Sequence, residues 1–420
     1  MSGSESQLQV AQRIAQECLL ALGVKGEVKE DQLRGLVPAL NGQDVFICPP
    51  TGFGKSACFQ AVPLAFEKIG IENVVVLVVS PLLAVIEHQV TNLNNQIAGY
   101  AMHIEDVKDF AKAERTKPRL LYTTPELLVE GADVPQLLRR PYFADNIRLL
   151  VFDEVHCVEL WGDTFRPAYS QVDTMMSLIS HKSIMAMTAT ATRATMGSLV
   201  NKLRMQSPHI VFKGSLSPAI HLCVKPFSGF EEYMANLLQQ MAAVRLYVEC
   251  ERTIIFFSSL EILETTFSRF RQLLGAHAHI NEVKGFRGSR VAMFHRCTAP
   301  EIKEYVLEEM RNPLSHLRMV FASSAFGLGI DAKGVTRVVH HSVPKEVNEF
   351  VQEIGRGGRG GGEVETVLFD RAIKISRDMA AYIATGDCRR AFLCACMGIQ
   401  YQKQQRCCDL CDSRKKLEKQ

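Results

Sequence analysis

Two groups of residues in this sequence are suited to phosphate chemistry, and the first is a glycine-rich loop that reads CPPTGFGKS after a short apolar run. Gly52 and Gly54 let the backbone turn its amides toward phosphate oxygens, Lys55 supplies a positive charge, and the Ser56 hydroxyl can ligate Mg²⁺. Pro49 stands where such loops usually carry their first glycine. A Gly-rich turn with an incidental lysine is the alternative, but the strand expected before and the helix expected after favour a phosphate loop.

The second group is the adjacent acids Asp153 and Glu154, which end another apolar run. We expect their strand to lie beside the glycine-rich loop, at the carboxyl edge of an open parallel sheet, where ligands bind. One carboxylate can hold Mg²⁺ while the other orients and deprotonates an attacking water. A lone Asp-Glu pair is more often a solvated strand end. Together with a phosphate loop upstream, it predicts an ATPase.

Two arginines far downstream are candidates for the same chemistry. Arg356 and Arg359 lie among glycines in VQEIGRGGRG. On a helix, residues three apart share one face, so both could stabilise a phosphoryl-transfer transition state from another lobe. A solvated basic loop is an equally good interpretation of this stretch alone. If the first interpretation holds, hydrolysis would open and close two lobes around the nucleotide.

The elements that position these residues are expected to be short strands alternating with helices. Continuous apolar strands separated by helices predict an α/β fold with parallel sheets covered on both faces. The pattern loosens between about Val211 and Glu251, in a passage rich in Gly, Ser and Pro that suits a connection between lobes. The expected strands are 44–48, 73–80, 147–154, 183–190, 252–259, 318–324, 336–342 and 365–370.

The composition fits a large globular protein. With 420 residues, 47% of them hydrophobic, the chain can form at least two packed cores. The net charge of +3 permits a nucleic-acid partner without arguing for one. We find no uncharged apolar run of about 18 residues and no signal-peptide pattern. A soluble intracellular protein with no membrane partner is therefore expected.

Taken together, the motifs resemble those of the RecQ family of superfamily-two DNA helicases, from about Val28 to Cys411. The most specific stretch is DEVHCVELWGDTFRPAY, residues 153–169. It is similar to the DEAH-type box and the adjoining aromatic-rich loop that distinguish RecQ proteins from DEAD-box RNA helicases. Further matches follow in family order: VKEDQ, SPLLAVIEHQV, TTPELL, TAT, MFHRC, ASSAFGLGID and QEIGRGGRG.

The resemblance implies an architecture and an activity. It implies two tandem RecA-like P-loop NTPase lobes with parallel sheets, followed by a small helical zinc-binding subdomain. It also implies an ATP-dependent 3′ to 5′ DNA helicase acting in repair, recombination or replication, with ATP, Mg²⁺ and Zn²⁺ as cofactors, single-stranded and branched DNA as partners, and a nuclear location. The expected boundaries are 1–20 for a flexible N-terminus, 21–213 for lobe one, 214–370 for lobe two and 371–420 for the zinc module.

The resemblance also assigns roles by position. Adenine recognition falls to Gln32, and coupling between lobes falls to Thr188, Thr190 and Asp331. The implied catalytic residues are Lys55, Asp153, Glu154, Arg356 and Arg359. The implied nucleotide-binding residues are Lys29, Gln32, Pro50, Thr51, Gly52, Phe53, Gly54, Lys55, Ser56, Asp153, Gln352, Arg356 and Arg359. The implied DNA contacts are Ser80, Gln89, Pro125, Glu126, Trp161, Phe165, Arg166 and Ser323.

The aromatic-rich loop explains where the chain places its only tryptophan. Exposed Trp161 and Phe165 can stack on bases, worth about 1–3 kcal/mol per base, and Arg166 can add phosphate attraction. A tryptophan capping a core edge is the alternative. Lys29 and Asp163 depart from the family, which usually has arginine and histidine there. These changes motivate a second hypothesis, a DNA-binding or scaffold protein with weakly coupled ATPase activity. An RNA helicase is disfavoured by the loop and the cysteine-rich tail.

Six of the 13 cysteines crowd the tail, in CRRAFLCACMGIQYQKQQRCCDLC. Thiolates in tetrahedral array suit Zn²⁺, and this stretch resembles the zinc-binding helical module of RecQ proteins. Reduced buried thiols without metal are the alternative. Three ligands match the family by position, whereas the family's fourth cysteine would fall at Gln405. The chosen set is Cys388, Cys407, Cys408 and Cys411, with Cys394 or Cys396 as fallbacks for Cys407.

Overall fold

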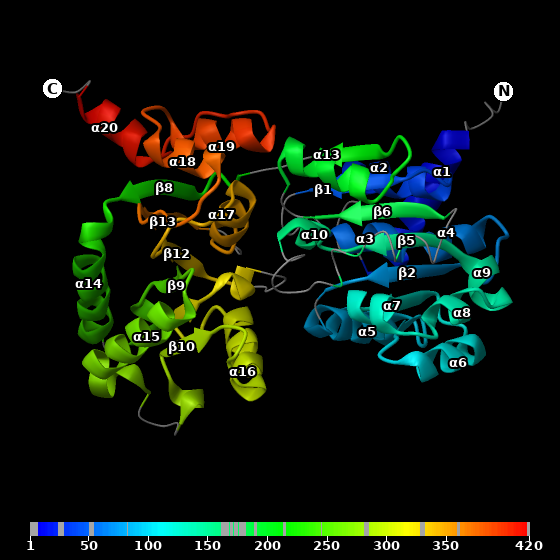
Figure 1. The fold of residues 1–420 in the computed structure, drawn as a ribbon, viewed down its shortest axis with the longest axis horizontal. Helices are drawn as coiled ribbons and strands as arrows, with labels where there is room; N and C mark the ends of the chain where they lie inside the picture. Colours follow the sequence, from blue (N-terminus) through cyan, green and yellow to red (C-terminus); the bar gives the residue numbers. More distant parts are fainter. Residues whose placement is uncertain are drawn as a thin grey trace. The chain divides into compact units, whose positions relative to one another are not determined.

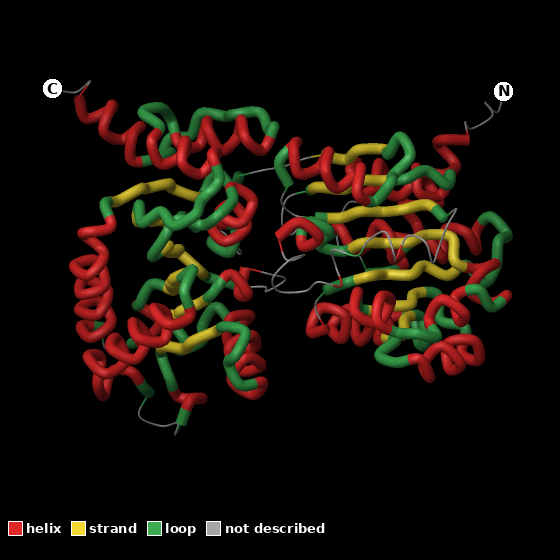
Figure 2. The backbone as a smooth tube through the Cα atoms, in the orientation of Figure 1, coloured by secondary structure: helices red, strands yellow, loops and turns green. Residues whose placement is uncertain are grey.

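The chain divides into two compact units, Met1–Gly214 and Ser215–Gln420, in the computed structural model (Figure 1). Each unit is α/β with a single parallel sheet, which confirms the predicted fold class. Helices flank the strands in both units (Figure 2). The structure describes all residues except 1–6, 24–28, 50–53, 82, 161–167, 169–170, 172–174, 176–181, 189–190, 213–215, 245, 281–284, 328–331, 359–361 and 418–420.

The first unit is built on a 7-stranded sheet with the order β3-β4-β2-β5-β6-β1-β7. Its strands are β1 (Val45–Cys48), β2 (Val75–Val79), β3 (Ala101–His103), β4 (Leu120–Thr123), β5 (Ile147–Phe152), β6 (Ser183–Met187) and β7 (His209–Phe212). The order adds a detail that was not predicted. One strand, β6, lies between the strand before the phosphate loop and the strand before Asp153, because β6 pairs with both β1 and β5.

The helices of the first unit cover the sheet and bring the nucleotide residues to its edge. Apolar side chains of the helices from α1 to α5 pack on alternate residues of β1, β2, β5 and β6. These helices are α1 (Gln7–Ala21), α2 (Glu30–Leu40), α3 (Lys55–Gln60), α4 (Val62–Lys68) and α5 (Leu83–Gln96). The others are α6 (Val107–Thr116), α7 (Pro125–Glu130), α8 (Val134–Leu138), α9 (Pro141–Asn146), α10 (Cys157–Leu160) and α13 (Arg193–Lys202).

Helix α1 differs from the flexible N-terminus that was expected for residues 1–20. Ala15, Cys18 and Leu19 are fully buried against the first unit. Their spacing places them on one face of a helix. The prediction of a flexible terminus relied on the small polar residues that precede the helix and missed this apolar face. Burial of an apolar helical face is the usual source of helix stability in a folded protein.

The second unit is built on a 6-stranded sheet with the order β10-β11-β9-β12-β13-β8. Its strands are β8 (Ile220–Lys225), β9 (Arg252–Phe256), β10 (Val291–Phe294), β11 (Met319–Ala322), β12 (Val335–His340) and β13 (Val364–Phe369). Strand β8 and helix α14 (Phe230–Ala243) lie inside the passage that was predicted to be a connection. The apolar residues of β8 are flanked by Ser and Pro, which masked the strand signal.

Helices pack on both faces of the second sheet. Helices α14 and α15 (Leu260–Leu274) bury phenylalanine and methionine side chains against one face. Helices α16 (Pro300–Arg311), α17 (Val347–Ile354), α18 (Arg377–Ala384) and α19 (Arg389–Met397) contribute to a core on the other face (Figure 1). Helix α20 (Asp409–Leu417) follows. The 3-10 turns are η1 (Phe227–Gly229), η2 (Tyr247–Glu249), η3 (Gly275–Ala278), η4 (Phe286–Gly288) and η5 (Ser324–Gly327).

The cysteine-rich tail shares this core with the sheet. Buried Cys407 and Cys408 pack in the same cluster as Ile220 and Leu222 of β8. The Leu222 backbone N–H donates to the Cys407 carbonyl at 3.3 Å, so the tail continues the edge of the sheet. In the described part of the chain no helix is long and apolar enough to cross a membrane.

Candidate nucleotide and metal sites

The carboxyl ends of three neighbouring strands carry the candidate catalytic residues of the first unit. Lys55 begins α3 just after β1, Asp153 follows β5, and Thr188 follows β6. Because all the strands are parallel, these ends meet at one edge of the sheet. The separation of β1 from β5 by β6 therefore does not separate Lys55 from the paired acids.

Lys55 and Glu154 form an ion pair across this edge. Lys55 Nζ lies 2.9 Å from Glu154 Oε1, and both side chains are 15% exposed. Burial lowers the pKa of Lys55, but the charges of Glu154 and Asp153 outweigh it and raise that pKa above its ordinary value. Burial also raises the pKa of Asp153 to about 6, although the positive charge of Lys55 opposes the rise. The edge thus holds one fixed cation beside two acids.

The backbone at Glu154 is unusual. Its φ of 46° lies in the left-handed region, which costs a non-glycine residue on the order of 1–3 kcal/mol. The Glu154 N–H donates to Asp153 Oδ1 at 3.0 Å, and the N–H of Val155 donates to the Met187 carbonyl at 2.8 Å. These bonds hold the turn in place and aim the Glu154 carboxylate at Lys55.

His156 was quoted in the motif but given no role, and it joins the acids to β6. Its Nδ1 lies 2.8 Å from Thr188 Oγ1 and 3.4 Å from Glu154 Oε2. Both His156 and Thr188 are buried. The contact gives a physical basis for the coupling role that the resemblance assigns to Thr188. Thr190 and Asp331, the other two predicted coupling residues, lie outside the described residues.

Gln32 lies next to the end of the glycine-rich loop. Its Nε2 donates to the Gly54 carbonyl at 3.4 Å, and its Oε1 accepts from the Lys29 backbone N–H at 3.0 Å. Gly54 has a φ of 84°, and a Cβ there would lie 3.0 Å from Gln32 Nε2, so glycine is required. Gly54, Lys55 and Ser56 are described. Four predicted loop residues lie outside the described residues: Pro50, Thr51, Gly52 and Phe53.

Three candidate DNA-binding residues of the first unit follow β2, which pairs with β5, or β4, which lies on the far side of β2. Ser80 is buried, and its N–H donates to the Thr123 carbonyl at 3.0 Å. Pro125 is buried and Glu126 is half-buried at the start of α7. Gln89 on α5 lies apart from them and contacts Ser56 instead, at 3.5 Å. Trp161, Phe165 and Arg166 lie outside the described residues.

In the second unit, Ser323 and Gly358 of the arginine motif lie at opposite ends of the sheet. Ser323 follows β11 and donates its N–H to the Phe294 carbonyl at 3.1 Å. Gly358 donates its N–H to the carbonyl of Val335, the first residue of β12, at 3.0 Å. Ser323 therefore lies at the carboxyl ends of the strands, and the motif reaches their amino ends.

The arginine motif itself corrects a prediction. Helix α17 ends at Ile354, so Arg356 lies in the turn after it and the shared helical face does not exist. Gly357 makes this turn possible, because a Cβ there would lie 2.5 Å from Val364 Cγ1. Arg356 is 3% exposed and Gln352 is also buried. Arg359 lies outside the described residues.

A buried cluster of acids and a histidine supports the arginine motif. Glu353 Oε2 lies 2.9 Å from His340 Nε2. Burial raises the pKa of Glu353 to about 8, although the charge of Arg356 opposes the rise. Burial lowers the pKa of His340 to about 3, and burial together with the charge of Glu353 raises the pKa of Glu349 to about 7. The Glu353–His340 contact is therefore a neutral hydrogen bond at neutral pH.

The tail brings together the four cysteines that were chosen as metal ligands. The Sγ atoms of Cys388, Cys407, Cys408 and Cys411 all lie within 4.8 Å of one another. In a tetrahedral site with Zn–S bonds of about 2.3 Å the sulfurs lie about 3.8 Å apart, so the cluster fits this ion. Hydrogen bonds from the Ala391 N–H, Tyr401 and two of the cysteines outweigh burial and lower the pKa of Cys388 to about 7. The fallback residues Cys394 and Cys396 are not in the cluster.

Charged side chains hold this cluster against β8. Asp409 accepts from Arg389 Nε at 2.7 Å and from the Val224 backbone N–H at 3.0 Å. Arg390 is buried and donates to the carbonyls of Leu216 and Ser217, at 3.1 and 3.0 Å, and to that of Ile220. Cys388 is thus followed by two arginines with structural roles: Arg389 binds Asp409, and Arg390 fixes the first residues of the second unit.

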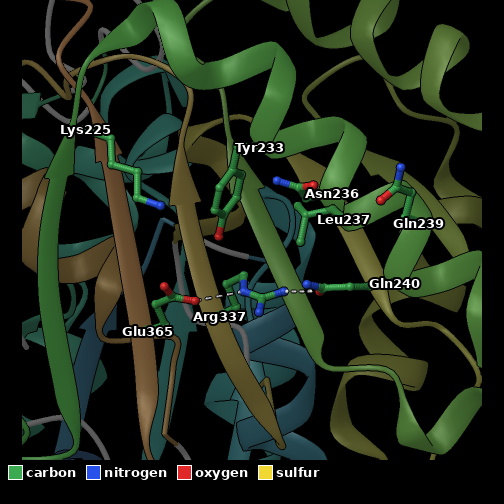
Figure 3. A pocket seen from close by; sticks show the side chains of 8 residues that line it. All are labelled: Lys225, Tyr233, Asn236, Leu237, Gln239, Gln240, Arg337 and Glu365. Atoms are coloured by element: carbon green, nitrogen blue, oxygen red, sulfur yellow. Dashed lines mark hydrogen bonds and ion pairs between the residues drawn. The ribbon is translucent and has the colours of Figure 1, made fainter.

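A polar pocket of about 390 Å³ lies between α14 and the strands β8, β12 and β13 (Figure 3). At its base Arg337 donates to Glu365 at 3.1 Å and to Gln240 at 3.3 Å, and it also pairs with Glu251. The Lys225 ammonium lies 4.9 Å above the Tyr233 ring. Since the guanidinium is already neutralised by carboxylates, the pocket is an internally paired cluster.

Comparison with known proteins agrees with this geometry. The DEAD/DEAH box helicase family matches residues 29–197, and the helicase conserved C-terminal domain matches residues 235–361. The solved structure of the DUF1998 helicase MrfA bound to DNA and AMPPNP has a TM-score of 0.64 at 17% identity, covering 89% of this chain and 51% of that one. The DEAD-box helicase Mss116 bound to ssRNA and UDP-BeF has a TM-score of 0.66 at 16% identity, covering 96% of this chain and 80% of that one. Both likenesses concern the fold.

Curated relatives carry the resemblance further. The ATP-dependent DNA helicase hus2/rqh1 of Schizosaccharomyces pombe is 29% identical over 81% of this chain and 24% of its own length. The ATP-dependent DNA helicase RecQ of Pasteurella multocida is 27% identical over 89% of this chain and 58% of its own length. The chain thus spans between about a quarter and three-fifths of these relatives. With the motifs in family order and both helicase domains matched, this chain is similar to RecQ helicases over most of its length.

Proposed function

We propose that this chain is an ATP-dependent DNA helicase or translocase that moves 3′ to 5′ and acts in DNA repair, recombination or replication. The observation that carries the proposal is the Lys55–Glu154 contact at the carboxyl edge of the first sheet, with Asp153 beside it. A phosphate loop cation paired with a candidate water-activating acid is the arrangement that nucleotide hydrolysis needs. The names of the relatives support DNA as the substrate.

In this mechanism the ion pair is a resting contact that the nucleotide breaks. When triphosphate oxygens reach the loop, they compete with Glu154 for the Lys55 ammonium. Lys55 then stabilises the outer phosphates, and the released Glu154 carboxylate orients water and accepts its proton. Ser56 and Asp153 would hold Mg²⁺, which supplies charge neutralisation at the phosphates when bound. Gln32 recognises adenine, assisted by Lys29 in place of the family's usual arginine.

The second unit supplies the remaining charge. We assign Arg356 and Arg359 to stabilising the transferred phosphoryl group, with Gln352 contacting the nucleotide. The position of Arg356 in the turn just after α17, in the motif that the resemblance assigns to this task, supports the role. Each cycle of hydrolysis would then open and close the two units and advance the strand.

DNA would bind along the edge formed by Ser80, Pro125 and Glu126, with Ser323 in the second unit. The aromatic loop that carries Trp161, Phe165 and Arg166 would stack on bases and report strand contact to the ATPase residues. Ser80 follows β2, which neighbours the strand before Asp153, and Pro125 and Glu126 follow the next strand, β4; this arrangement supports coupling. A nuclear location stays a prediction, because the matched relatives include bacterial proteins.

The cysteine cluster is proposed to bind Zn²⁺ through Cys388, Cys407, Cys408 and Cys411. The spacing of the four sulfurs and the lowered pKa of Cys388 support it. The ion would fix the tail that continues the edge of the second sheet, which is a structural role.

The deciding experiment is steady-state ATP hydrolysis with and without single-stranded DNA, beside the variants Glu154→Gln and Trp161→Ala. Strong stimulation by DNA, lost in both variants, is the expected result. Turnover that DNA leaves unchanged would instead favour the scaffold or DNA-binding protein with weakly coupled ATPase. A parallel series with single-stranded RNA tests the remaining alternative, since an RNA helicase would respond to RNA more strongly than to DNA.

A further inference from the structure

Gln89 on α5 was predicted to contact DNA, but its side chain is directed at the phosphate loop helix. Its Nε2 lies 3.5 Å from Ser56 Oγ, and its Oε1 accepts from Tyr122 Oη at 2.9 Å and from Gln60 Nε2 at 3.3 Å. Ser56 and Gln60 belong to α3 and Tyr122 to β4. Three elements of the first unit therefore meet at one amide.

The two donors at Oε1 decide which way the amide faces. An amide oxygen only accepts hydrogen bonds and an amide nitrogen only donates them. Tyr122 is 1% exposed, and burial raises the pKa of its phenol, so the phenol keeps the proton that it donates to Gln89 while its oxygen accepts from Gln60 Nε2 at 3.3 Å. With Oε1 accepting from Tyr122 and Gln60, the Nε2 of Gln89 faces Ser56. The 3.5 Å bond to Ser56 is long, but its direction is set by the shorter bonds behind it.

This direction has a consequence for the serine hydroxyl. A hydroxyl has two acceptor lone pairs and one donor hydrogen. A donor at one lone pair leaves the other lone pair for a cation and restricts the rotation of the hydroxyl. Gln89 can therefore preorganise the ligand atom that the proposed nucleotide site offers to Mg²⁺. Helix α5 begins three residues after Ser80, so the same helix starts beside the proposed DNA contacts.

We propose that Gln89, fixed by Tyr122 and Gln60, positions the Ser56 hydroxyl for Mg²⁺ and so links helix α5 to the metal-dependent part of nucleotide binding. Gln89 is then a positioning residue rather than a DNA contact. The inference rests on the proposed nucleotide site. It deepens that proposal by naming the path through which a shift of α5 on DNA would reach the phosphate loop.

Tyr122→Phe is the sharpest test, because a side chain buried in β4 cannot touch DNA. The variant removes the 2.9 Å bond and lets the Gln89 amide turn, while the ring still fills the core. Tyr100→Phe is the matched control, since Tyr100 is also buried in the first unit and its hydroxyl donates to the Gln60 backbone carbonyl at 2.7 Å instead of to Gln89. Gln89→Leu removes the amide itself.

The measurement is equilibrium binding of a fluorescent ADP analogue to the full chain, with Mg²⁺ and with EDTA. The loss of one hydrogen bond, about 0.5–1.5 kcal/mol, corresponds to about a 2- to 13-fold change in affinity. We expect Tyr122→Phe and Gln89→Leu to reduce the Mg²⁺-dependent gain in affinity by that factor and to leave binding in EDTA unchanged. Tyr100→Phe should keep the full gain, and circular dichroism should show that all three variants are folded.

Two outcomes would overturn the inference. If both variants keep the wild-type gain from Mg²⁺, the network does not position Ser56. If Gln89→Leu weakens only the binding of labelled single-stranded DNA, measured by anisotropy without nucleotide, Gln89 is a DNA contact as first predicted. A wild-type chain that binds no nucleotide with Mg²⁺ would instead refute the proposed function, and this inference with it.

Discussion

Replacing Glu353 by glutamine should make the second unit more stable at neutral pH. Glu353 is the penultimate residue of α17, and its buried carboxyl forms a hydrogen bond of 2.9 Å with His340. Burial holds its pKa at about 8, compared with 4.5 for an ordinary glutamate, and the charge of Arg356 only partly opposes this. Glutamine has nearly the same shape, still reaches His340 and never has to take up a proton.

The magnitude follows from proton linkage. A carboxyl whose pKa is raised in the folded state binds its proton more tightly there, so its contribution to stability is full below pH 4.5 and is lost as pH rises toward 8. Each unit of pKa difference corresponds to about 1.4 kcal/mol. Between pH 6.5 and 8 the unfolding free energy should therefore fall by up to about 2 kcal/mol in the wild type relative to Glu353→Gln.

This pH window avoids the opposite effect of His340. The pKa of His340 is lowered to about 3, so its contribution to the unfolding free energy is lost as pH falls below 6.5 and is constant above pH 6.5. Glu349, one helical turn before Glu353, has a pKa of about 7, and the charge of Glu353 contributes to that rise. Its titration in the same window should therefore be weaker in Glu353→Gln and should widen the gap between the two proteins. Lys345, which faces Glu349, is common to both.

The assay is denaturant unfolding followed by circular dichroism at several pH values from 6.5 to 8. An exposed acid beside the start of the same helix gives the control Glu346→Gln, which should follow the wild type throughout. A gap between wild type and Glu353→Gln that stays constant over this range would refute the assignment of a neutral Glu353.

Three further predictions concern the sites. Glu154→Gln should lower ATP turnover by about 10²–10⁴-fold while binding of a fluorescent nucleotide is retained, and loss of binding would show a structural role instead. Thr188→Val removes the 2.8 Å contact to buried His156, so the unfolding free energy should fall by about 1 kcal/mol; an unchanged denaturation midpoint would contradict the contact. Cys408→Ser should abolish the binding of Zn²⁺, measured by atomic absorption, and should lower the melting temperature as a chelator lowers that of the wild type. A metal content equal to that of the wild type would refute the ligand set.

The sequence predicted most of the strands that lie in the middle of each sheet but none of the four at the edges. Continuous apolar runs identified β2, β5, β9 and β12, which are buried on both faces. The overlooked strands β3, β7, β8 and β10 are edge strands, and they are short or alternate with polar residues because one side of each lacks a partner strand. β4 was missed as well, since it has only four residues, LLYT, and ends in a polar threonine. The pattern of apolar runs does not give the strand order, so the position of β6 between β1 and β5 was not predicted.

The site residues were predictable where the chemistry requires a particular residue type, but not where the packing of neighbouring side chains decides how a residue is oriented. The Lys55–Glu154 contact follows from two motifs whose spacing has a mechanism. No motif predicts that Gln89 turns toward Ser56, because Tyr122 and Gln60 that direct it carry no signature of their own. Among the cysteines, spacing left three choices for the fourth zinc ligand. The structure supports Cys407 over Cys394 and Cys396, because the tail returns to Cys388 and brings Cys407 into the cluster.

The position of β8 has a consequence for how the chain is made. β8 is the first strand of the second unit in sequence, yet its neighbours in space are β13 and the cysteine-rich tail. The backbone N–H of Val224 in β8 donates to Asp409, which lies 185 positions later in the sequence. The first unit can therefore complete its sheet while the second is still being synthesised, whereas the second cannot close until Asp409 has left the ribosome. In that interval β8 presents apolar side chains and unpaired backbone groups to the cell, and the edge of this sheet is where a newly made chain is most open to aggregation or to a chaperone.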